Sequence, residues 1–347
     1  MKKLLLFTLP VFFLLVATSL VLKTTPAQTQ TSRAKPQPQS DYRISGPYTH
    51  NNLTVFLLHG NDLISGHNFI TLQEALAQKK VIVYETKDVN ELAIRNLSNQ
   101  DVYVQAGDIV RGGDQDRMIS TDFIVPPKSG RMPIAAFCVE SGRWSQRKGE
   151  VAGSFSSSEN SVSTKDLKLA AKSANSQSAV WKNVEVAQTK LSENLNTKVQ
   201  SAVSASSFEL SVENPKVKET AATYIDALAG IVNNKSDVIG YAFAINGHVN
   251  SADVYASRSL FAKLWPKLLK ASAIEAIAEL QSDTKPEPVA DEVILAFLGD
   301  SEKAAAAEKP VTQRVKLVTR EDDKNIFFET RDLRQKDAWI HRNYIRK

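Results

Sequence analysis

Residues 238–255 read VIGYAFAI, NG, HVNSADVY, two runs of eight residues joined by Asn246 and Gly247. An Asn-Gly pair favours the positive φ angles of a tight two-residue turn, so the segment predicts a β-hairpin. Strands joined by so short a turn are antiparallel. We therefore place an antiparallel strand pair at the centre of the fold and work outward from it.

Helical periodicity dominates the residues on either side of this hairpin. Upstream, apolar side chains recur at helical spacing over 180–195 and 217–231. Asn214 and Pro215 fit the cap and the first position of the second of these helices. Downstream, we expect a helix from about residue 259, which Pro266 kinks or divides.

Strands are expected at both ends of the folded part of the chain. Apolar or alternating runs punctuated by Gly, Pro, Asn and Asp mark them. One helix interrupts them near 72–78, where Thr71 and Glu74 are spaced as a capping box. The strands expected in the first part of the chain are 53–58, 81–85, 92–97, 102–110, 118–125 and 132–139. Near the C-terminus we expect a short helix at 289–298 and a linker at 299–310. These are followed by closing strands at 311–319, 325–330 and 338–345.

The order of strands, then helices, then strands predicts an α+β fold. We expect a mostly antiparallel sheet with a helical middle section, because the βαβα alternation of a parallel sheet is absent. One domain should cover residues 45–347. Within it, residues 145–180 are rich in Ser, Asn and Lys. They predict either a long mobile loop or a surface helix of low stability.

The N-terminus predicts the compartment. Lys2 and Lys3 precede an apolar run over 4–22, and small and polar residues follow it, which is the layout of an export signal over residues 1–27. The run is longer than a usual signal core of about 7–15 residues, so a membrane anchor over 4–22 is the alternative. Residues 28–44 are predicted to be a linker. We expect the folded part to be exported, to the periplasm or the extracellular space.

Composition and charge exclude several classes of protein. The 347 residues are 42% hydrophobic and 23% charged, which excludes collagen-like, coiled-coil and wholly disordered chains. The formal net charge is +5, and the export signal holds three Lys and no acid, so the remainder carries +2. So small a surplus does not predict a nucleic-acid partner. Membrane contact is expected only if the N-terminal segment stays uncleaved.

The sequence contains none of the common catalytic or cofactor motifs. It has no phosphate loop, dinucleotide fingerprint, zinc helix or G-x-S-x-G elbow. The one cysteine, Cys138, lies in an apolar run over 134–139 and is expected to be a buried small side chain, the alternative being a catalytic thiol. His59 and His67, the one close histidine pair, are expected in a solvated loop. No metal site is predicted, and no cofactor can be named.

The densest polar segment, residues 105–117, reads QAGDIVRGGDQDR and lies between expected strands. Paired glycines let the backbone turn and expose amide groups. Its arginines suit an anion, and its carboxylates suit a cation or a general base. The alternative is a wide hairpin turn whose acids and arginines pair with each other. The candidate residues are Asp108, Arg111, Asp114, Gln115, Asp116 and Arg117.

A second polar cluster follows the strand that carries Cys138. It consists of Glu140, Arg143 and Trp144. Polar groups at the end of a strand are well placed for a binding site. The equally weighted alternative is that Glu140 and Arg143 form a structural ion pair and that Trp144 covers the core. Both interpretations stay open at this point.

These two clusters resemble the ARG and Rhodanese-Phosphatase-superfamily-associated protein domain, a family of unknown function. The resemblance covers about residues 45–347 and implies Gln115, Arg117, Glu140, Arg143 and Trp144 as family positions, without a reaction. Asp114 stands where many members carry a basic residue, which argues against anion binding at that position. The matching residues are Gly107, RGGDQDR at 111–117, Val125, Pro126, Pro133, CVESGRW at 138–144, AINGH at 244–248 and LWPKLL at 264–269.

Two functional hypotheses follow. The first is an exported domain that binds a small polar ligand or a protein partner through the Gly107–Arg117 turn and the Glu140–Trp144 cluster. The second is a hydrolase in which Asp116 or Glu140 activates water, with Arg117 or Arg143 stabilising negative charge. The sequence does not decide whether the protein is an enzyme.

Overall fold

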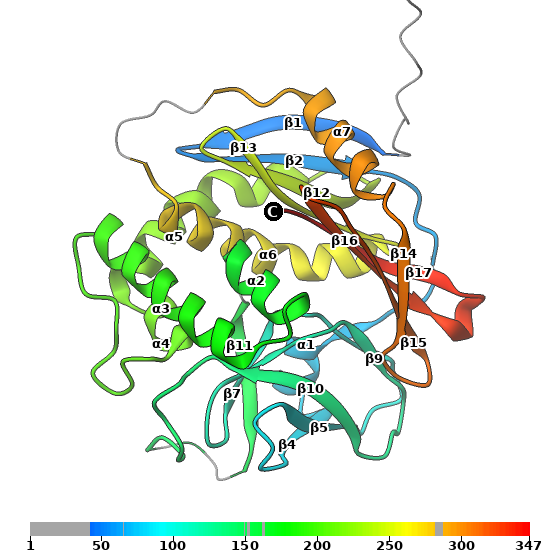
Figure 1. Ribbon diagram of the computed structural model, residues 1–347. Helices are drawn as coiled ribbons and strands as arrows, with labels where there is room; N and C mark the ends of the chain where they lie inside the picture. Colours follow the sequence, from blue (N-terminus) through cyan, green and yellow to red (C-terminus); the bar gives the residue numbers. More distant parts are fainter. Residues whose placement is uncertain (1–41, 65, 149, 151–152, 162–163, 282–286) are drawn as a thin grey trace, which may run out of the picture. The chain divides into compact units, whose positions relative to one another are not determined.

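The computed structural model describes residues 42–347, except 65, 149, 151–152, 162–163 and 282–286 (Figure 1). The predicted export signal, and the predicted linker up to residue 41, lie outside the described residues. Within the described ranges, no helix has both the length and the apolar character of a membrane span.

An eight-stranded antiparallel sheet is built around the predicted hairpin. Asn246 and Gly247 have φ angles of 53° and 79°, as the two-residue turn requires. Every neighbouring pair in the sheet is antiparallel. In spatial order the strands are β1 (Arg43–His50), β2 (Leu53–His59), β12 (Val238–Ile245), β13 (His248–Tyr255), β17 (Ala338–Arg346), β16 (Asn325–Asp332), β15 (Val315–Glu321) and β14 (Ala306–Pro310).

The central strands of this sheet are covered on both faces. Leu53, Val55 and Leu57 of β2 pack into one hydrophobic cluster, while Phe56 and Leu58 pack into another. Because successive side chains of a strand point to opposite faces, burial on both sides gives the continuous apolar run in the sequence. Helix α6 (Arg258–Ala278) packs against β12 and β2, and α7 (Asp291–Ser301) joins the other cluster.

Two smaller sheets hold the described strands from β3 to β11. The six-stranded sheet has the order β11-β7-β8-β10-β5-β4, and the three-stranded sheet has the order β3-β6-β9. Among the described strands, β3 and β6 form the one parallel pair. The bounds are β3 (Ile70–Thr71), β4 (Val81–Glu85), β5 (Glu91–Asn96), β6 (Val102–Val104), β7 (Asp108–Gly112), β8 (Arg117–Ile119), β9 (Phe123–Val125), β10 (Met132–Cys138) and β11 (Phe155–Ser161).

Two long strands expected from the sequence are each divided. Residues 102–110 break at Gly107, whose φ is 91° and whose amide donates to the Ile119 carbonyl. Residues 118–125 break before Asp122, because β8 pairs with β10 while β9 pairs with β6. Apolar runs alone do not show where a chain changes from one sheet to another.

The helices lie mainly in the middle of the chain, as predicted. Thr71 and Glu74 form the expected capping box, and Asn214 caps α5 ahead of Pro215. Pro266 lies inside α6 and does not divide it, because residues on both sides of it are held in one core cluster. The remaining helices are α1 (Leu72–Ala77), α2 (Lys165–Lys172), α3 (Gln177–Asn194), α4 (Phe208–Val212), α5 (Pro215–Leu228) and the short 3₁₀ turns η1 (Ala229–Val232) and η2 (Leu333–Gln335).

Three segments differ from the sequence-based expectation. The described part of 145–180 is not one long loop: it forms β11, α2 and the start of α3, and Leu167 of α2 is fully buried. The low apolar density misleads because β11 and α2 each bury only a narrow face. Residues 299–310 are the end of α7 and β14, not a linker, and the linker expected up to residue 44 ends within β1. The α+β fold with a mostly antiparallel sheet is confirmed.

Candidate functional site

The glycine turn of the sequence analysis is the connection between β7 and β8. Gly112 and Gly113 have φ angles of 131° and 56°. A Cβ atom on Gly112 would lie 2.4 Å from the carbonyl oxygen of Ser154, so the backbone passes β11 too closely for any side chain. This close passage directs the residues after the turn, Gln115 and Asp116, into the interior, where both are fully buried.

Asp116 and Glu140 meet there around two arginines. Arg147 Nη2 donates to Asp116 Oδ2 at 2.5 Å and to Glu140 Oε2 at 2.9 Å. Arg143 Nε donates to Glu140 Oε2 at 2.8 Å, and its Nη2 lies 3.4 Å from Asp116 Oδ1. Glu150 accepts from Arg147 Nη1 at 3.0 Å. We call Asp116, Glu140, Arg143, Arg147 and Glu150 the buried ion network.

The ion network is closed to solvent. The carboxylates of Asp116 and Glu140 have no exposed surface, and the two arginine side chains are at most 8% exposed. Burial raises the pKa of Asp116, and the ion pair with Arg147 opposes this rise. Gln115 Nε2 donates to the Glu140 carbonyl at 2.8 Å, which ties the turn to the end of β10. The arrangement is therefore that of a structural clamp.

The other predicted site residues point to separate partners. Asp108 contacts Lys267, and Asp114 contacts Lys87 at 2.9 Å. Arg117 contacts Glu85 at 3.2 Å. The nine candidates thus do not form one site: Gln115, Asp116, Glu140 and Arg143 come together, Arg111 reaches the network only at its edge, with Nε 3.9 Å from Glu150 Oε1, and Asp108, Asp114, Arg117 and Trp144 lie apart.

Two interpretations of these clusters can now be compared with the geometry. Glu140 and Arg143 form the ion pair that was one of the alternatives, but Trp144 is 59% exposed and does not cover the core. Arg111 binds Glu213 at 2.8 Å, so the turn's arginines pair outside the turn. A general base needs access to water, and neither Asp116 nor Glu140 has it here, so this geometry does not support the hydrolase hypothesis at these residues.

A second buried polar cluster was not predicted. His341 of β17 lies between two carboxylates: its Nδ1 is 2.7 Å from Asp122 Oδ2 and its Nε2 is 3.0 Å from Asp253 Oδ1. Thr330 Oγ1 donates to Asp122 at 2.9 Å, and Asn343 Nδ2 donates to Asp253 at 2.9 Å. The ring of His341 also stacks on Tyr255.

The charge of this cluster follows from its contacts. Burial lowers the pKa of His341, but the two carboxylates outweigh it and the pKa is raised. In turn, although burial acts to raise the pKa of Asp122, the contacts with His341 hold it well below its usual range. Both ring nitrogens face a carboxylate, which suits the protonated ring, because both nitrogens then donate.

Lys172, the last residue of α2, lies beside this cluster. Its Nζ donates to Asn343 Oδ1 at 2.8 Å and lies 4.5 Å from the centre of the Phe328 ring. Among the described residues, no carboxylate lies within ion-pair distance of this ammonium group. Burial lowers its pKa, and the more distant charges of Asp122 and Asp253 oppose the change.

Two cavities meet at Lys172. A narrow one of about 30 Å³ is lined by Lys172, His341, Asp253 and the predicted turn residue Gly107. The larger, of about 430 Å³, lies between the end of α2, the segment after β8 and the β14–β15 pair. Its size falls within the range of about 300–1,000 Å³ typical of small-molecule sites.

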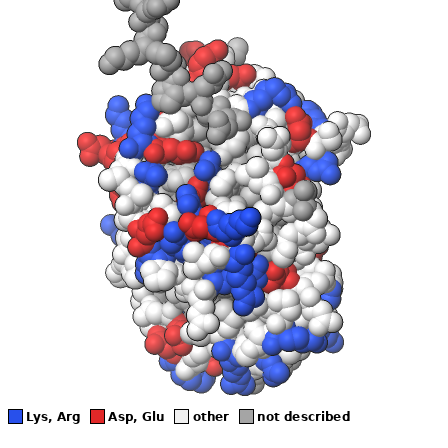
Figure 2. All heavy atoms as spheres, turned by 90° about the vertical axis from the view of Figure 1, so that its right-hand side faces the viewer, with Lys and Arg blue, Asp and Glu red and all other residues white. Residues whose placement is uncertain are grey.

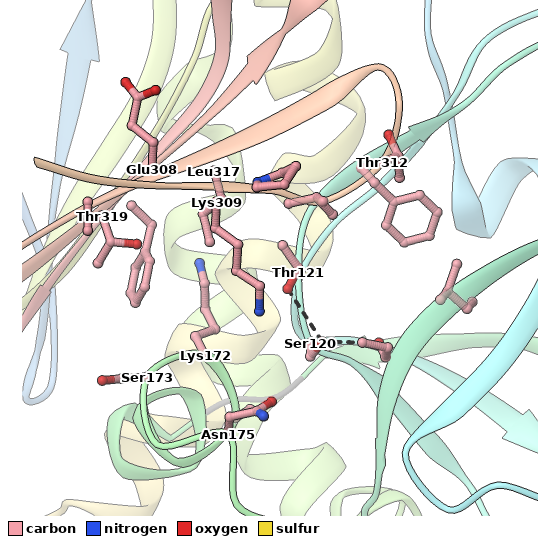
Figure 3. Close-up of a pocket in the computed structure, with 18 of the residues that line it drawn as sticks. Ser120, Thr121, Lys172, Ser173, Asn175, Glu308, Lys309, Thr312, Leu317 and Thr319 are labelled. Carbon is pink, nitrogen blue, oxygen red and sulfur yellow. Dashed lines mark hydrogen bonds between the residues drawn. The ribbon is translucent and has the colours of Figure 1, made fainter.

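The lining of the larger cavity is part polar and part apolar and carries two cations. Figure 3 shows Lys172 and Lys309 with their ammonium groups toward the middle of the cavity, while the Glu308 carboxylate points away. Lysine and arginine also gather near the middle of the face drawn in Figure 2, with acidic side chains among them. The remaining hydrogen-bonding side chains of the lining are Ser120, Thr121, Ser173, Asn175, Thr312, Thr319 and Glu321, and the Glu321 carboxylate is paired with Lys347 at 2.6 Å.

Sequence reasoning missed this second site for a definite reason. His341 is 219 residues from Asp122 and 88 residues from Asp253, so no local spacing marks the cluster. Lys172 lay in the segment expected to be a loop or weak helix. A usable signal was the position of His341 and Asn343 two residues apart in the closing strand, since such residues share one face of a sheet.

No three His, Cys, Asp or Glu side chains of the described residues are grouped so as to hold a metal ion. Neither the curated proteins nor the solved structures include a significant match to this chain. The model of the ARG and Rhodanese-Phosphatase-superfamily-associated Protein domain matches residues 41–345, which is nearly all of the folded part. This chain is therefore a member of that family.

Proposed function

We propose that this domain binds a small anionic ligand, a carboxylate or phosphate, in the 430 Å³ cavity beside Lys172. The observation that carries the proposal is the partly buried ammonium group of Lys172, which has one hydrogen bond to Asn343 and no ion-pair partner among the described residues. Removing a cation from water is costly unless an anion compensates it. A bound anion would supply that compensation.

The polar lining supports the same ligand class. Lys309 on β14 brings a second ammonium group, and Ser173 and Asn175 follow directly after α2. Charge-assisted hydrogen bonds to carboxylate and phosphate are the strong ones, so a few such donors suffice for orientation. The proposal keeps the binding class expected from the sequence but moves it from the Gly107–Arg117 turn and the Glu140–Trp144 cluster to the cavity beside Lys172.

The proposal is tested by titrating the folded domain with inorganic phosphate and with succinate, using calorimetry and the change in melting temperature. We expect Lys172→Met to weaken binding about tenfold to a hundredfold, as loss of one charged hydrogen bond does. Lys165→Met, on the same helix but outside this cavity, should bind as the wild type does. Wild-type protein that binds neither probe, or a Lys172→Met variant that binds equally well, would overturn the proposal.

We also propose that the domain works outside the cytoplasm. The support is the sequence of residues 1–27 alone. Expression of the full chain in a bacterial host, with N-terminal sequencing of the protein from the periplasm and the membrane, tests it. A mature N-terminus near residue 28 in the periplasm supports cleavage, an intact N-terminus in the membrane supports an anchor, and intact protein in the cytoplasm contradicts both.

A further inference from the structure

Three polar side chains from neighbouring strands form a hydrogen-bonded chain at one end of the large sheet. Ser45 lies on the edge strand β1, His59 is the last residue of β2, and Asp237 directly precedes β12. Ser45 Oγ lies 2.7 Å from His59 Nε2. His59 Nδ1 lies 2.7 Å from Asp237 Oδ1. This is the connectivity of a nucleophile, its base and an orienting carboxylate.

No pattern in the sequence joins these three residues. His59 was expected in a solvated loop, but it is 4% exposed and its β2 position pairs with both β1 and β12. Ser45 and Asp237 are 192 positions apart in the chain and meet only through the sheet order β1-β2-β12 (Figure 1). None of the three lines the cavity proposed above for the anion.

The protonation pattern suits a general base. A carboxylate on Nδ1 holds the proton on that nitrogen, which leaves the lone pair of Nε2 to accept the hydroxyl proton of Ser45. Arg43 also binds Asp237, with Nη2 at 2.6 Å from Oδ2. The Asp237 carboxylate is thus shared between the His59 ring and a guanidinium group.

The strand pairing beside Ser45 is irregular, and this irregularity leaves the Ser45 side chain partly exposed. The pairing of β1 with β2 shifts register between Ser45 and Tyr48. The next residue, Gly46, has a φ of 138°, and a Cβ atom there would lie 3.0 Å from the Val55 carbonyl oxygen. Bulges at sheet edges redirect side chains and often lie beside active sites. Ser45 is half-buried, and half of the Asp237 side chain is exposed. The hydrogen-bonded residues Ser45, His59 and Asp237 are therefore in contact with solvent at both ends.

A groove of about 590 Å³ is lined by residues that flank Asp237 in sequence, although Ser45, His59 and Asp237 do not themselves line it. Its lining includes Lys235 and Val238, on either side of Asp237 in sequence, together with the apolar side chains of Phe261 and Trp265. Such a lining accepts an apolar group better than a charged one. It therefore suggests the kind of substrate whose reacting carbon would be held near Ser45.

We propose that Ser45, His59 and Asp237 are a catalytic triad that hydrolyses small carboxylic esters bearing an apolar group. Ser45 Oγ attacks the ester carbonyl carbon, and its proton passes to His59 Nε2. The bond from that carbon to the alkoxy oxygen breaks, and the alcohol leaves with the proton from His59. Water then adds to the acyl-serine, gives one proton to His59, and releases the carboxylic acid as Ser45 regains its proton.

The test uses the folded domain with a fluorophosphonate probe and with p-nitrophenyl butyrate. We expect the probe to modify Ser45, found by peptide mass analysis, and Ser45→Ala to abolish both modification and turnover. His59→Gln should lower kcat about 10²- to 10⁴-fold, the usual contribution of a general base. Asp237→Asn should lower kcat while leaving KM nearly unchanged, because it alters the base and not the groove.

Ser236→Ala is the matched control, since it removes an exposed hydroxyl one residue from Asp237 and should leave labelling unchanged. Melting curves of every variant establish that it is folded. Wild-type protein that is not labelled at Ser45 and does not turn over the ester overturns the proposal, as does labelling that persists undiminished in folded His59→Gln. Because Lys172→Met leaves this site intact, its esterase activity should equal that of the wild type whatever the outcome for anion binding.

Discussion

Asp116 and Arg147 form an ion pair inside the protein, with Nη2 and Oδ2 2.5 Å apart and less than a tenth of either side chain exposed. Arg147 also binds Glu140, so one guanidinium group holds the turn after β7 to the end of β10. Arg147 lies outside the CVESGRW string, four residues after Arg143. Its role could not be predicted from the polar segment 105–117 or from the Glu140–Trp144 cluster alone. In this chain, the polar residues around the end of β10 thus form an internal clamp.

Loss of Arg147 should be among the most damaging single changes in this part of the chain. Arg147→Met leaves Asp116 and Glu140 buried with only Arg143 to compensate two charges, and we expect a loss of about 3–5 kcal/mol in unfolding free energy. Arg111→Met removes an ion pair whose members are about one-third exposed, and should cost at most about 1 kcal/mol. Urea unfolding of both variants measures this. Equal small losses would show that the clamp is not needed for stability.

The hairpin turn gives a second stability prediction. Gly247 has a φ of 79°, and a Cβ atom there would lie 2.9 Å from the Glu287 carbonyl oxygen. We expect Gly247→Ala to cost about 1–3 kcal/mol, because both the backbone angle and the contact oppose it. Gly130→Ala adds its Cβ to open space at an ordinary φ and should change stability by less than about 0.5 kcal/mol. Thermal unfolding distinguishes the two, and similar melting temperatures would contradict the argument.

The sequence predicts those parts of the fold that depend on local signals. The Asn246–Gly247 turn, the Thr71–Glu74 capping box and the Asn214–Pro215 helix start each rest on a few adjacent residues, and all three are confirmed. What it does not predict is the point at which the chain leaves one sheet for another, as before Asp122, because that depends on partners far along the chain.

The candidate sites show the same limit. Gln115, Asp116, Glu140 and Arg143 were found because they lie in two dense polar strings, and they do come together. Density, however, does not distinguish an internal clamp from a site open to solvent. The chain Ser45–His59–Asp237 and the Lys172 cavity contain residues that are isolated in sequence, so only the arrangement of strands and helices reveals them.

Cys138 should be inert while the protein is folded. It is fully buried, and burial raises the pKa of its thiol to about 11. Since the thiolate is the reactive form, we expect no measurable reaction with Ellman's reagent at pH 8 until urea unfolds the chain. Val203→Cys places a thiol at a position that is 74% exposed and should react at once. Rapid reaction of native wild-type protein would restore the alternative of a catalytic thiol.

Glu209 gives the protein a predictable dependence of stability on pH. It lies in α4, where Ser158 and Asn160 donate to its Oε1 at 2.6 and 3.0 Å, and its Oε2 has no hydrogen-bond partner among the described residues. Burial raises its pKa from 4.5 to about 7. The folded state therefore holds this proton more tightly than the unfolded chain does.

That difference fixes the sign of the effect. The contribution of the Glu209 proton to the free energy of unfolding is fully present below about pH 4.5 and is lost as the pH rises to about 7. This contribution totals about 3 kcal/mol. Glu209→Gln keeps the acceptor for Ser158 and Asn160 and removes the titration, so its unfolding free energy should not show this decline. Glu213→Gln, a partly exposed neighbour on the same segment, should decline as the wild type does. Parallel curves for wild type and Glu209→Gln between pH 4 and 8 would mean that folding does not raise the pKa of Glu209, because only a group that binds its proton more tightly when folded makes stability fall as pH rises.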